Sequence, residues 1–218
     1  MLILNDIKIK LDLAQLASYM YLTPEMPEYA EFAELLESIR PYAKPVALLD
    51  EASILEKTPD KIISSLGEFN CSLLAQLVEN SEKIFPFIVS CGTVMDAFGI
   101  DISDPLQLYW IDFLKEFAME QAFKKIKSEV QQICPNEKIT SLIPSDDLVW
   151  NLEGLKDIFN VFPLGSRNEL GLGLTEYLHM QPIKTRAGVF FASHKEVDIC
   201  ELCNIKKCNS CPIKEKSK

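Results

Sequence analysis

The sequence is poor in the residues and motifs on which common enzyme classes depend. Its two histidines, His179 and His194, do not support a Ser-His-Asp or Cys-His arrangement. Only eight glycines occur in 218 residues. The segment GLGLTE comes nearest to a phosphate-binding loop, but it does not match G-x-G-x-x-G, and no P-loop is present. These absences argue against nucleophilic hydrolases and against dinucleotide-binding enzymes.

Cations are also scarce, and no apolar segment is long. Lysine and arginine number 22 against 32 aspartates and glutamates, a net charge of −10. A surface that binds nucleic acid or an anionic membrane needs a local excess of cations, so we expect neither partner. No apolar run approaches the roughly 20 residues that span a bilayer, and the first ten residues do not match a signal peptide. We therefore expect a cytoplasmic protein, with enough apolar residues for a globular core.

Cysteine is present in an odd number, seven, which does not suit a secreted disulfide framework. Cys71, Cys91 and Cys134 are scattered in apolar segments, and we expect them to pack as small core side chains. The other four form a C-x2-C-x4-C-x2-C motif near the end of the chain: Cys200, Cys203, Cys208 and Cys211. This motif is the strongest functional signal in the sequence.

Four thiolates at this spacing can ligate one iron–sulfur cluster or close one tetrahedral zinc site. Only four residues separate the two C-x2-C pairs, and Pro212 follows the last cysteine as in bacterial ferredoxins. We therefore favour a [4Fe–4S] cluster over zinc. A dithiol redox pair and a segment of free cysteines stay as alternatives. His194 is more typical of an exposed linker than of a metal ligand here.

Charge changes along the chain near the same place. Residues 201–218 hold five lysines and two glutamates, a net charge of +3, so residues 1–200 carry −13. We therefore divide the chain into a body, residues 1–195, and a cysteine-rich metal-binding tail, residues 196–218.

Hydrophobic spacing in the body predicts an α+β fold, with a mostly antiparallel sheet because helices and strands do not alternate regularly. Asp104 and Pro105 suit the N-cap and first residue of the longest helix. Residues 135–150 are polar and marked by proline, so we expect a loop there. Helical patterns occur at residues 23–45, 70–81, 104–134 and 151–162, and strand patterns at residues 2–13, 45–54, 83–92, 169–178 and 187–193.

Three segments and the cysteine motif together resemble a known family. The segments are IFPFIVSCG, the helical WIDFLKEFAMEQAFKK and GLGLTEYLHMQPIKTRAGVFF. Over most of residues 1–211 the chain resembles the reactivation domain of cobalamin-dependent methionine synthase, in the small stand-alone form that ends in cysteines. The most specific part of the resemblance is one group of residues: Leu174, Thr175, Glu176, Met180, Pro182, Lys184, Thr185 and Gly188.

The resemblance implies a bent antiparallel sheet with flanking helices. It also implies a role in returning oxidised, inactive cob(II)alamin to the methylated state with S-adenosylmethionine and an electron donor. The expected partners are a corrinoid protein or cobalamin-dependent methyltransferase and an electron donor protein, and the tail cluster would relay the electron. Two alternatives stay open. One is a methyl donor that binds S-adenosylmethionine through a rebuilt loop, and the other is a binding module, not an enzyme, whose tail holds structural zinc.

The family's ligand loop departs from its pattern in this chain. The family binds S-adenosylmethionine partly through an Arg-x-x-Pro-Gly-Tyr loop. Here Pro144 is kept, but Ser141, Ser145 and Asp146 stand at the arginine, glycine and tyrosine places. Losing the arginine removes a charge-assisted contact to the methionine carboxylate worth about 1.5–3 kcal/mol. We therefore expect weak binding of S-adenosylmethionine or none.

No catalytic residue is assigned, but four residues are candidates for contact with the cofactor: Asp12, Glu120, Ser145 and Tyr177. In the resemblance, Asp12 lies near the acid of the first strand, and Glu120 takes the place of an acid on the long helix. Ordinary roles also suit both residues, since Asp12 can cap a helix and Glu120 can lie on a solvated helix face. Trp150 could replace the aromatic ring that the loop has lost.

Overall fold

The computed structural model describes residues 1–5, 7–78, 81–145 and 150–193, so the cysteine motif lies outside the described residues. Within them, the main feature is an eight-stranded sheet with antiparallel pairings throughout. Its order is β1-β2-β6-β3-β4-β5, with β10 on the other edge of β6 and β7 beyond β10. The strands are β1 (Leu2–Leu4), β2 (Val46–Leu49), β3 (Ala52–Lys57), β4 (Ile62–Ser64), β5 (Gly67–Phe69), β6 (Lys83–Ser90), β7 (Lys138–Leu142) and β10 (Thr185–Ser193).

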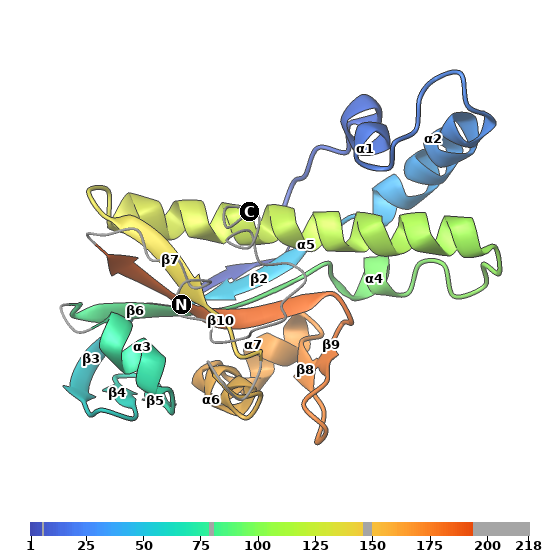
Figure 1. The fold of residues 1–218 in the computed structure, drawn as a ribbon. Coiled ribbons are helices and arrows are strands. Elements are labelled where there is room, and N and C mark those ends of the chain that lie inside the picture. The colour runs from blue at the N-terminus through green and yellow to red at the C-terminus, as the bar shows by residue number, and fades with distance from the viewer. Residues whose placement is uncertain (6, 79–80, 146–149, 194–218) are drawn as a thin grey trace, which may run out of the picture.

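Helices flank this sheet on both faces (Figure 1). The long helix α5 (Pro105–Ile133) crosses one face. The other face carries α3 (Ser72–Leu77), α6 (Gly154–Val161), α7 (Leu164–Glu169) and the small hairpin of β8 (Gly173–Leu174) and β9 (Met180–Gln181). The remaining helices are α1 (Leu13–Tyr19), α2 (Pro27–Ile39), the short 3-10 helix η1 (Arg40–Tyr42) and α4 (Thr93–Asp96). This confirms the expected α+β class with an antiparallel sheet and flanking helices.

Alternation along β10 supplies both apolar layers. Phe190 packs toward α5 with Phe87, their rings stacked at 4.3 Å between centroids. Its neighbour Phe191 belongs to the cluster on the opposite face, which α3 and α6 close. Successive side chains of a strand point to opposite faces, so this one strand anchors both layers. A third cluster joins α1 and α2 to the first half of α5, at one end of the molecule (Figure 1).

The helix predictions agree with the structure where periodicity is long. The Asp104 side chain caps α5 by accepting hydrogen bonds from the backbone N–H groups of Leu106 (2.8 Å) and Gln107 (3.2 Å), as expected. Three predictions of strand or loop were wrong. Residues 169–178 were expected to form a strand, but Glu169 ends α7 and only Gly173–Leu174 pair, as β8. Residues 135–150 were expected to form a loop but contain β7, which is largely polar because only Ile139 and Leu142 of its five residues are buried. Residues 2–13 were expected to form one strand, but the strand β1 covers only Leu2–Leu4, and Asp12 is the N-cap of α1.

The end of α1 has an unusual residue at its turn. The N–H of Leu22 donates to the Ala17 carbonyl (2.9 Å), and the N–H of Tyr21 donates to the Ser18 carbonyl (3.2 Å). These two bonds make a Schellman motif, in which the residue with positive φ is usually glycine. Here it is Tyr21, with φ of 56°. A side chain at such a φ is strained by its Cβ atom.

Replacing Tyr21 with glycine is expected to raise the free energy of unfolding by about 0.5–1 kcal/mol, because glycine adopts this φ without strain. Urea denaturation followed by circular dichroism measures the change. Tyr21→Ala is the matched control, since it removes the ring but keeps the Cβ atom. Equal stability of the alanine and glycine variants would show that the backbone at this turn is unstrained.

Candidate ligand-binding cleft

A cleft of about 670 Å³ lies where α4, the segment after it, the first half of α5 and the turn between β9 and β10 meet. Its walls are apolar and its polar groups are few. Ile100 and Ile183 stand at its mouth with 78% and 76% of their surfaces exposed. The polar lining includes Thr93, Asp96, Asp112, Lys115 and Gln181. Concave sites of this size and composition are typical of small-molecule binding.

Asp96 and Lys115 hold the walls of the cleft together. The Asp96 carboxylate accepts a hydrogen bond from the N–H of Ile183 (3.3 Å), which ties α4 to the turn before β10. The Lys115 ammonium donates to the backbone carbonyl oxygen of Asp96 (2.6 Å), which ties α5 to α4. Both groups therefore fix the cleft geometry and also present charge to it.

The residues that carry the family resemblance meet this cleft at the turn before β10. Pro182 lines it directly. The Thr185 hydroxyl donates to the Pro182 carbonyl oxygen (2.7 Å) and lies 3.0 Å from the Ser90 hydroxyl, so it fixes the turn on β6. Gly188, three residues on, is needed for close packing. A Cβ atom there would lie 2.6 Å from the Leu142 carbonyl oxygen.

Lys184 connects the turn to α5. Its ammonium lies 3.0 Å from the Asp112 carboxylate and 3.6 Å from that of Glu116. Burial lowers the pKa of Lys184, but the hydrogen bonds to Asp112 and Glu116 and their negative charges outweigh burial, so its pKa is raised. Lys184 therefore stays charged and keeps Asp112 at the edge of the cleft.

Cys91 is a buried thiol close to Lys184 and Asp96. Its N–H donates to the Lys184 carbonyl (3.0 Å), and its side chain has no exposed surface. Burial, followed by the charge of Asp96, raises the pKa of the Cys91 thiol to about 12. A thiol with such a pKa is neutral and unreactive at neutral pH. Cys71 is also buried in the core, as expected, whereas Cys134 is half-buried.

Thiol labelling with iodoacetamide at pH 8 is expected to spare Cys91 and Cys71 and to modify Cys134, because among the three cysteines that the structure describes only Cys134 is partly accessible. Mass spectrometry of tryptic peptides reads out each cysteine separately. Labelling under denaturing conditions is the control and should modify all three. Modification of Cys91 in the folded protein at the rate of Cys134 would contradict its burial beneath the cleft.

The structure gives Asp12 and Glu120 contacts within the chain. The Asp12 side chain caps α1 by accepting from the Gln15 N–H (3.0 Å), and this bond lowers the pKa of Asp12. Glu120 pairs with Arg186 of β10, whose guanidinium also lies 3.5 Å from Glu116. Glu120 comes two turns of α5 after Asp112, about 12 Å along the helix axis. Neither Asp12 nor Glu120 lines the cleft.

Ser145 and Tyr177 lie elsewhere as well. The Ser145 N–H donates to the Trp150 carbonyl (3.0 Å). Tyr177 is 75% exposed in the turn between β8 and β9, and it does not line the cleft. Trp150 was expected to offer an aromatic face, and this expectation was wrong. Its side chain is 2% exposed and packs in the core beside α6.

The structure does not bring the four candidates together in this cleft, and instead its charged lining comes from Asp96, Asp112 and Lys115. The sequence held a partial signal for the last two, which are spaced i, i+3 on the predicted long helix and so share one face. The position of Asp96 depends on how α4 folds back over β10. No sequence pattern predicts that contact.

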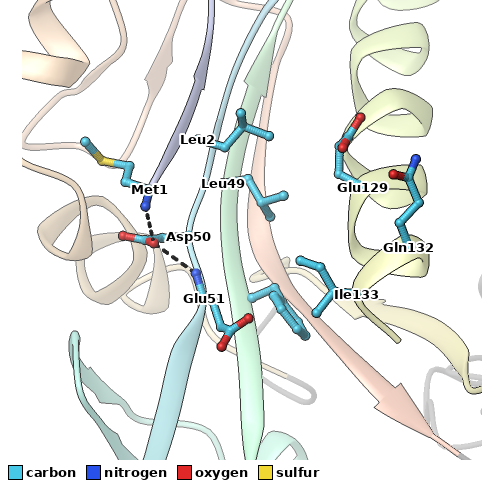
Figure 2. Close-up of a pocket in the computed structure, with 9 residues that line it drawn as sticks. Met1, Leu2, Leu49, Asp50, Glu51, Glu129, Gln132 and Ile133 are labelled. Atoms are coloured by element: carbon cyan, nitrogen blue, oxygen red, sulfur yellow. Dashed lines mark hydrogen bonds and ion pairs between the residues drawn. The ribbon is translucent and has the colours of Figure 1, made fainter. Parts of the chain in front are cut away.

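A second cleft, of about 410 Å³, lies between the start of β1 and the last turns of α5. Figure 2 shows Glu129, Gln132 and Ile133 on α5 opposite the strands. The Asp50 carboxylate is engaged here, because it lies 2.8 Å from the Met1 amino group and accepts from the Glu51 N–H (3.0 Å). None of the eight most specific residues of the resemblance lines this cleft, whereas Pro182 lines the larger one, so the larger cleft is the candidate ligand site.

Two searches were made within residues 1–5, 7–78, 81–145 and 150–193. No group of three or more histidine, cysteine, aspartate or glutamate side chains is arranged to hold a metal ion in this part of the chain. No helix there combines the length and apolar character needed to cross a membrane. The predicted metal ligands Cys200, Cys203, Cys208 and Cys211 lie outside these residues.

Comparison with solved structures supplies a match over most of the chain. No family model matches the chain, and no curated protein matches it. Among solved structures, the crystal structure of the MetH reactivation domain bound to AdoHcy matches with a TM-score of 0.64 and 13% sequence identity. The match covers 89% of this chain and 80% of the other. The chain has the fold of the MetH reactivation domain. At this identity the comparison shows the shared fold alone.

Proposed function

We propose that this protein reactivates a cobalamin-dependent methyltransferase. It would dock on a corrinoid protein whose cobalt has been oxidised to cob(II)alamin. One electron from a donor protein reduces the cobalt, and the methyl group of S-adenosylmethionine passes to it, which leaves S-adenosylhomocysteine. The observation that carries the proposal is the MetH reactivation-domain fold over 89% of the chain.

The lining of the 670 Å³ cleft supports binding of an S-adenosyl compound. The MetH domain in the matching structure is bound to AdoHcy. In this chain the cleft offers carboxylates from Asp96 and Asp112 that attract an ammonium or sulfonium group, and exposed apolar surface at Ile100 and Ile183 that suits an adenine ring. Contact of Asp12, Glu120, Ser145 or Tyr177 with the ligand stays a prediction.

The tail is proposed to hold the electron relay. Cys200, Cys203, Cys208 and Cys211 would ligate a [4Fe–4S] cluster, for the reasons of spacing given above. Electron transfer needs no positioned acid or base, which is consistent with the few catalytic residues in the sequence. The competing proposal is a zinc site that only stabilises the tail, and metal analysis separates the two.

Titration calorimetry with S-adenosylmethionine tests the cleft. The expected result is weak but measurable binding by the wild-type chain and about tenfold weaker binding by Ile183→Lys, because the variant loses apolar contact and adds a cation beside the positively charged sulfonium ligand. Ile133→Lys is the matched control, since Ile133 is 50% exposed at the other cleft. Equal weakening by both variants, or no binding by the wild type, would contradict an S-adenosyl site here.

A second candidate function is a binding module without a cofactor of its own. The observation in its favour is the changed loop, in which Ser141, Ser145 and Asp146 stand where the family has arginine, glycine and tyrosine. Such a module would bind the methyltransferase but no S-adenosyl compound. The calorimetric experiment therefore also separates the two candidates.

A further inference from the structure

Three tyrosines are displayed at the end of the molecule formed by α1, α2 and the first half of α5. Tyr19, Tyr21 and Tyr109 have 51%, 87% and 60% of their surfaces exposed. The Tyr19 ring packs edge-on against Phe113, with centroids 6.2 Å apart. Tyr109 lies one helical turn before Phe113 on α5. The rings of Tyr19, Tyr109 and Phe113 therefore lie on facing parts of α1 and α5. Together with Tyr21, two residues after the end of α1, they are here called the tyrosine face: Tyr19, Tyr21, Tyr109 and Phe113.

Tyr21 is held on this face at a cost in stability. It occupies the left-handed position of the Schellman motif, at φ of 56°, where glycine would be unstrained. Its ring is 87% exposed, so burial does not compensate for the strain. A strained residue whose side chain points to solvent suggests a role outside the chain.

The segments that carry the tyrosine face are rich in acidic residues and poor in cations. Residues 11–39 contain six aspartates and glutamates and neither lysine nor arginine. Residues 101–114 contain three aspartates and again no cation. The exposed members of this acidic set include Glu25, Glu31, Glu34 and Asp112. Three of these nine acids form ion pairs within the chain, Asp12 with Lys10, Glu37 with Arg40 and Asp112 with Lys184. The other six, with the exposed tyrosines, complement a basic protein surface, because arginine pairs with carboxylates and stacks on aromatic rings.

We propose that the tyrosine face is the docking surface for a partner protein with a lysine- and arginine-rich patch, and that this partner is the cobalamin-dependent methyltransferase. The inference rests on the proposed function and names the surface that the function uses. Exposed tyrosines supply the contact energy, since tyrosine is enriched at interface hot spots. The acidic surroundings accelerate association and select the partner by charge.

The test uses the full chain and a purified cobalamin-dependent methionine synthase that lacks its own reactivation domain. Tyr21→Gly and Tyr109→Ala are each expected to weaken binding about tenfold in calorimetry. Tyr177→Ala is the matched control, because Tyr177 is 75% exposed on the β8–β9 hairpin and lies outside the tyrosine face. Raising the ionic strength from about 0.05 M to about 0.3 M is expected to weaken wild-type binding as well.

The glycine variant separates docking from folding. Tyr21→Gly should make the chain more stable yet bind more weakly, a combination that loss of structure does not produce. Wild-type binding that all three tyrosine variants leave unchanged would overturn the docking surface but leave the proposed function standing. Absence of wild-type binding would overturn both.

Photo-crosslinking from benzoylphenylalanine at position 21 identifies what covers the face. A crosslink to the methyltransferase supports the proposal. A crosslink to residues 201–218 of the same chain, which carry a net charge of +3, would overturn it in favour of the chain's own tail. A crosslink to a second copy would overturn it in favour of a homodimer.

Discussion

Gly188→Ala is expected to lower the free energy of unfolding by about 3 kcal/mol, the upper end of the range for overpacking a core. The new Cβ atom would lie 2.6 Å from the Leu142 carbonyl oxygen of β7 and 3.0 Å from the Phe87 ring of β6. Neither neighbour can move freely, because β10 pairs with both strands and Phe87 is stacked on Phe190. The sheet would have to separate on both edges of β10. Urea denaturation measures the loss.

Gly165→Ala provides the matched control for the same chemical change. Gly165 lies in α7, and a Cβ atom there would meet no atom within 4 Å. This variant should gain about 0.5–1 kcal/mol, because alanine is the better helix former. The two glycine-to-alanine changes are therefore expected to shift stability in opposite directions. A loss of less than about 1 kcal/mol for Gly188→Ala would contradict the close approach of β7 and β6 to β10.

Cys203→Ser is expected to abolish metal binding, because a site of four ligands loses one thiolate and serine is a poor ligand for iron or zinc. The measurement is iron, sulfide and zinc content with the visible spectrum, on protein purified without oxygen. Wild type should show broad absorbance near about 400 nm that bleaches on reduction, with about four irons per chain. The melting temperature of the body should stay the same, since the residues described before 194 already form three apolar clusters.

Cys134→Ser is the control for this experiment. Cys134 follows the end of α5 and is half-buried, and it lies apart from the motif in sequence. This variant should retain all of the metal. Metal loss in both variants would show that the tail motif is not a complete ligand set. Stoichiometric zinc without colour would contradict the cluster and support the structural-zinc alternative.

Long periodic segments allowed most of the fold to be predicted from sequence. The helical patterns of α2, α5 and α6 each span at least two turns, and Asp104 with Pro105 marks the start of α5 directly. Strand β7 could not be predicted in this way, because it is five residues long and only Ile139 and Leu142 are buried. Short strands take their identity from pairing partners, here β10, and such partners are distant in sequence.

The ligand cleft was less predictable than the fold. The motif of Met180, Pro182, Lys184 and Thr185 pointed to the turn that lines the candidate cleft. Its physical reasons appear only in three dimensions, as the Thr185 contact with Ser90 and the Lys184 pair with Asp112. Asp12 and Glu120 were chosen by analogy, and the structure shows the ordinary roles available to them, a helix cap and an ion pair with Arg186. Acidic residues at the ends of helices often cap them, and acidic residues between packed elements often form ion pairs. The sequence alone therefore does not separate such residues from those that contact a ligand.

The most direct test of the central claim is a reactivation assay. A cobalamin-dependent methionine synthase without its own reactivation domain is oxidised to the cob(II)alamin form and mixed with this protein, S-adenosylmethionine and a reduced electron donor protein. The account predicts that the cob(II)alamin spectrum is replaced by that of methylcobalamin and that methyltransferase activity returns. An unchanged spectrum, under conditions in which an authentic reactivation domain restores the enzyme, would contradict the proposed function.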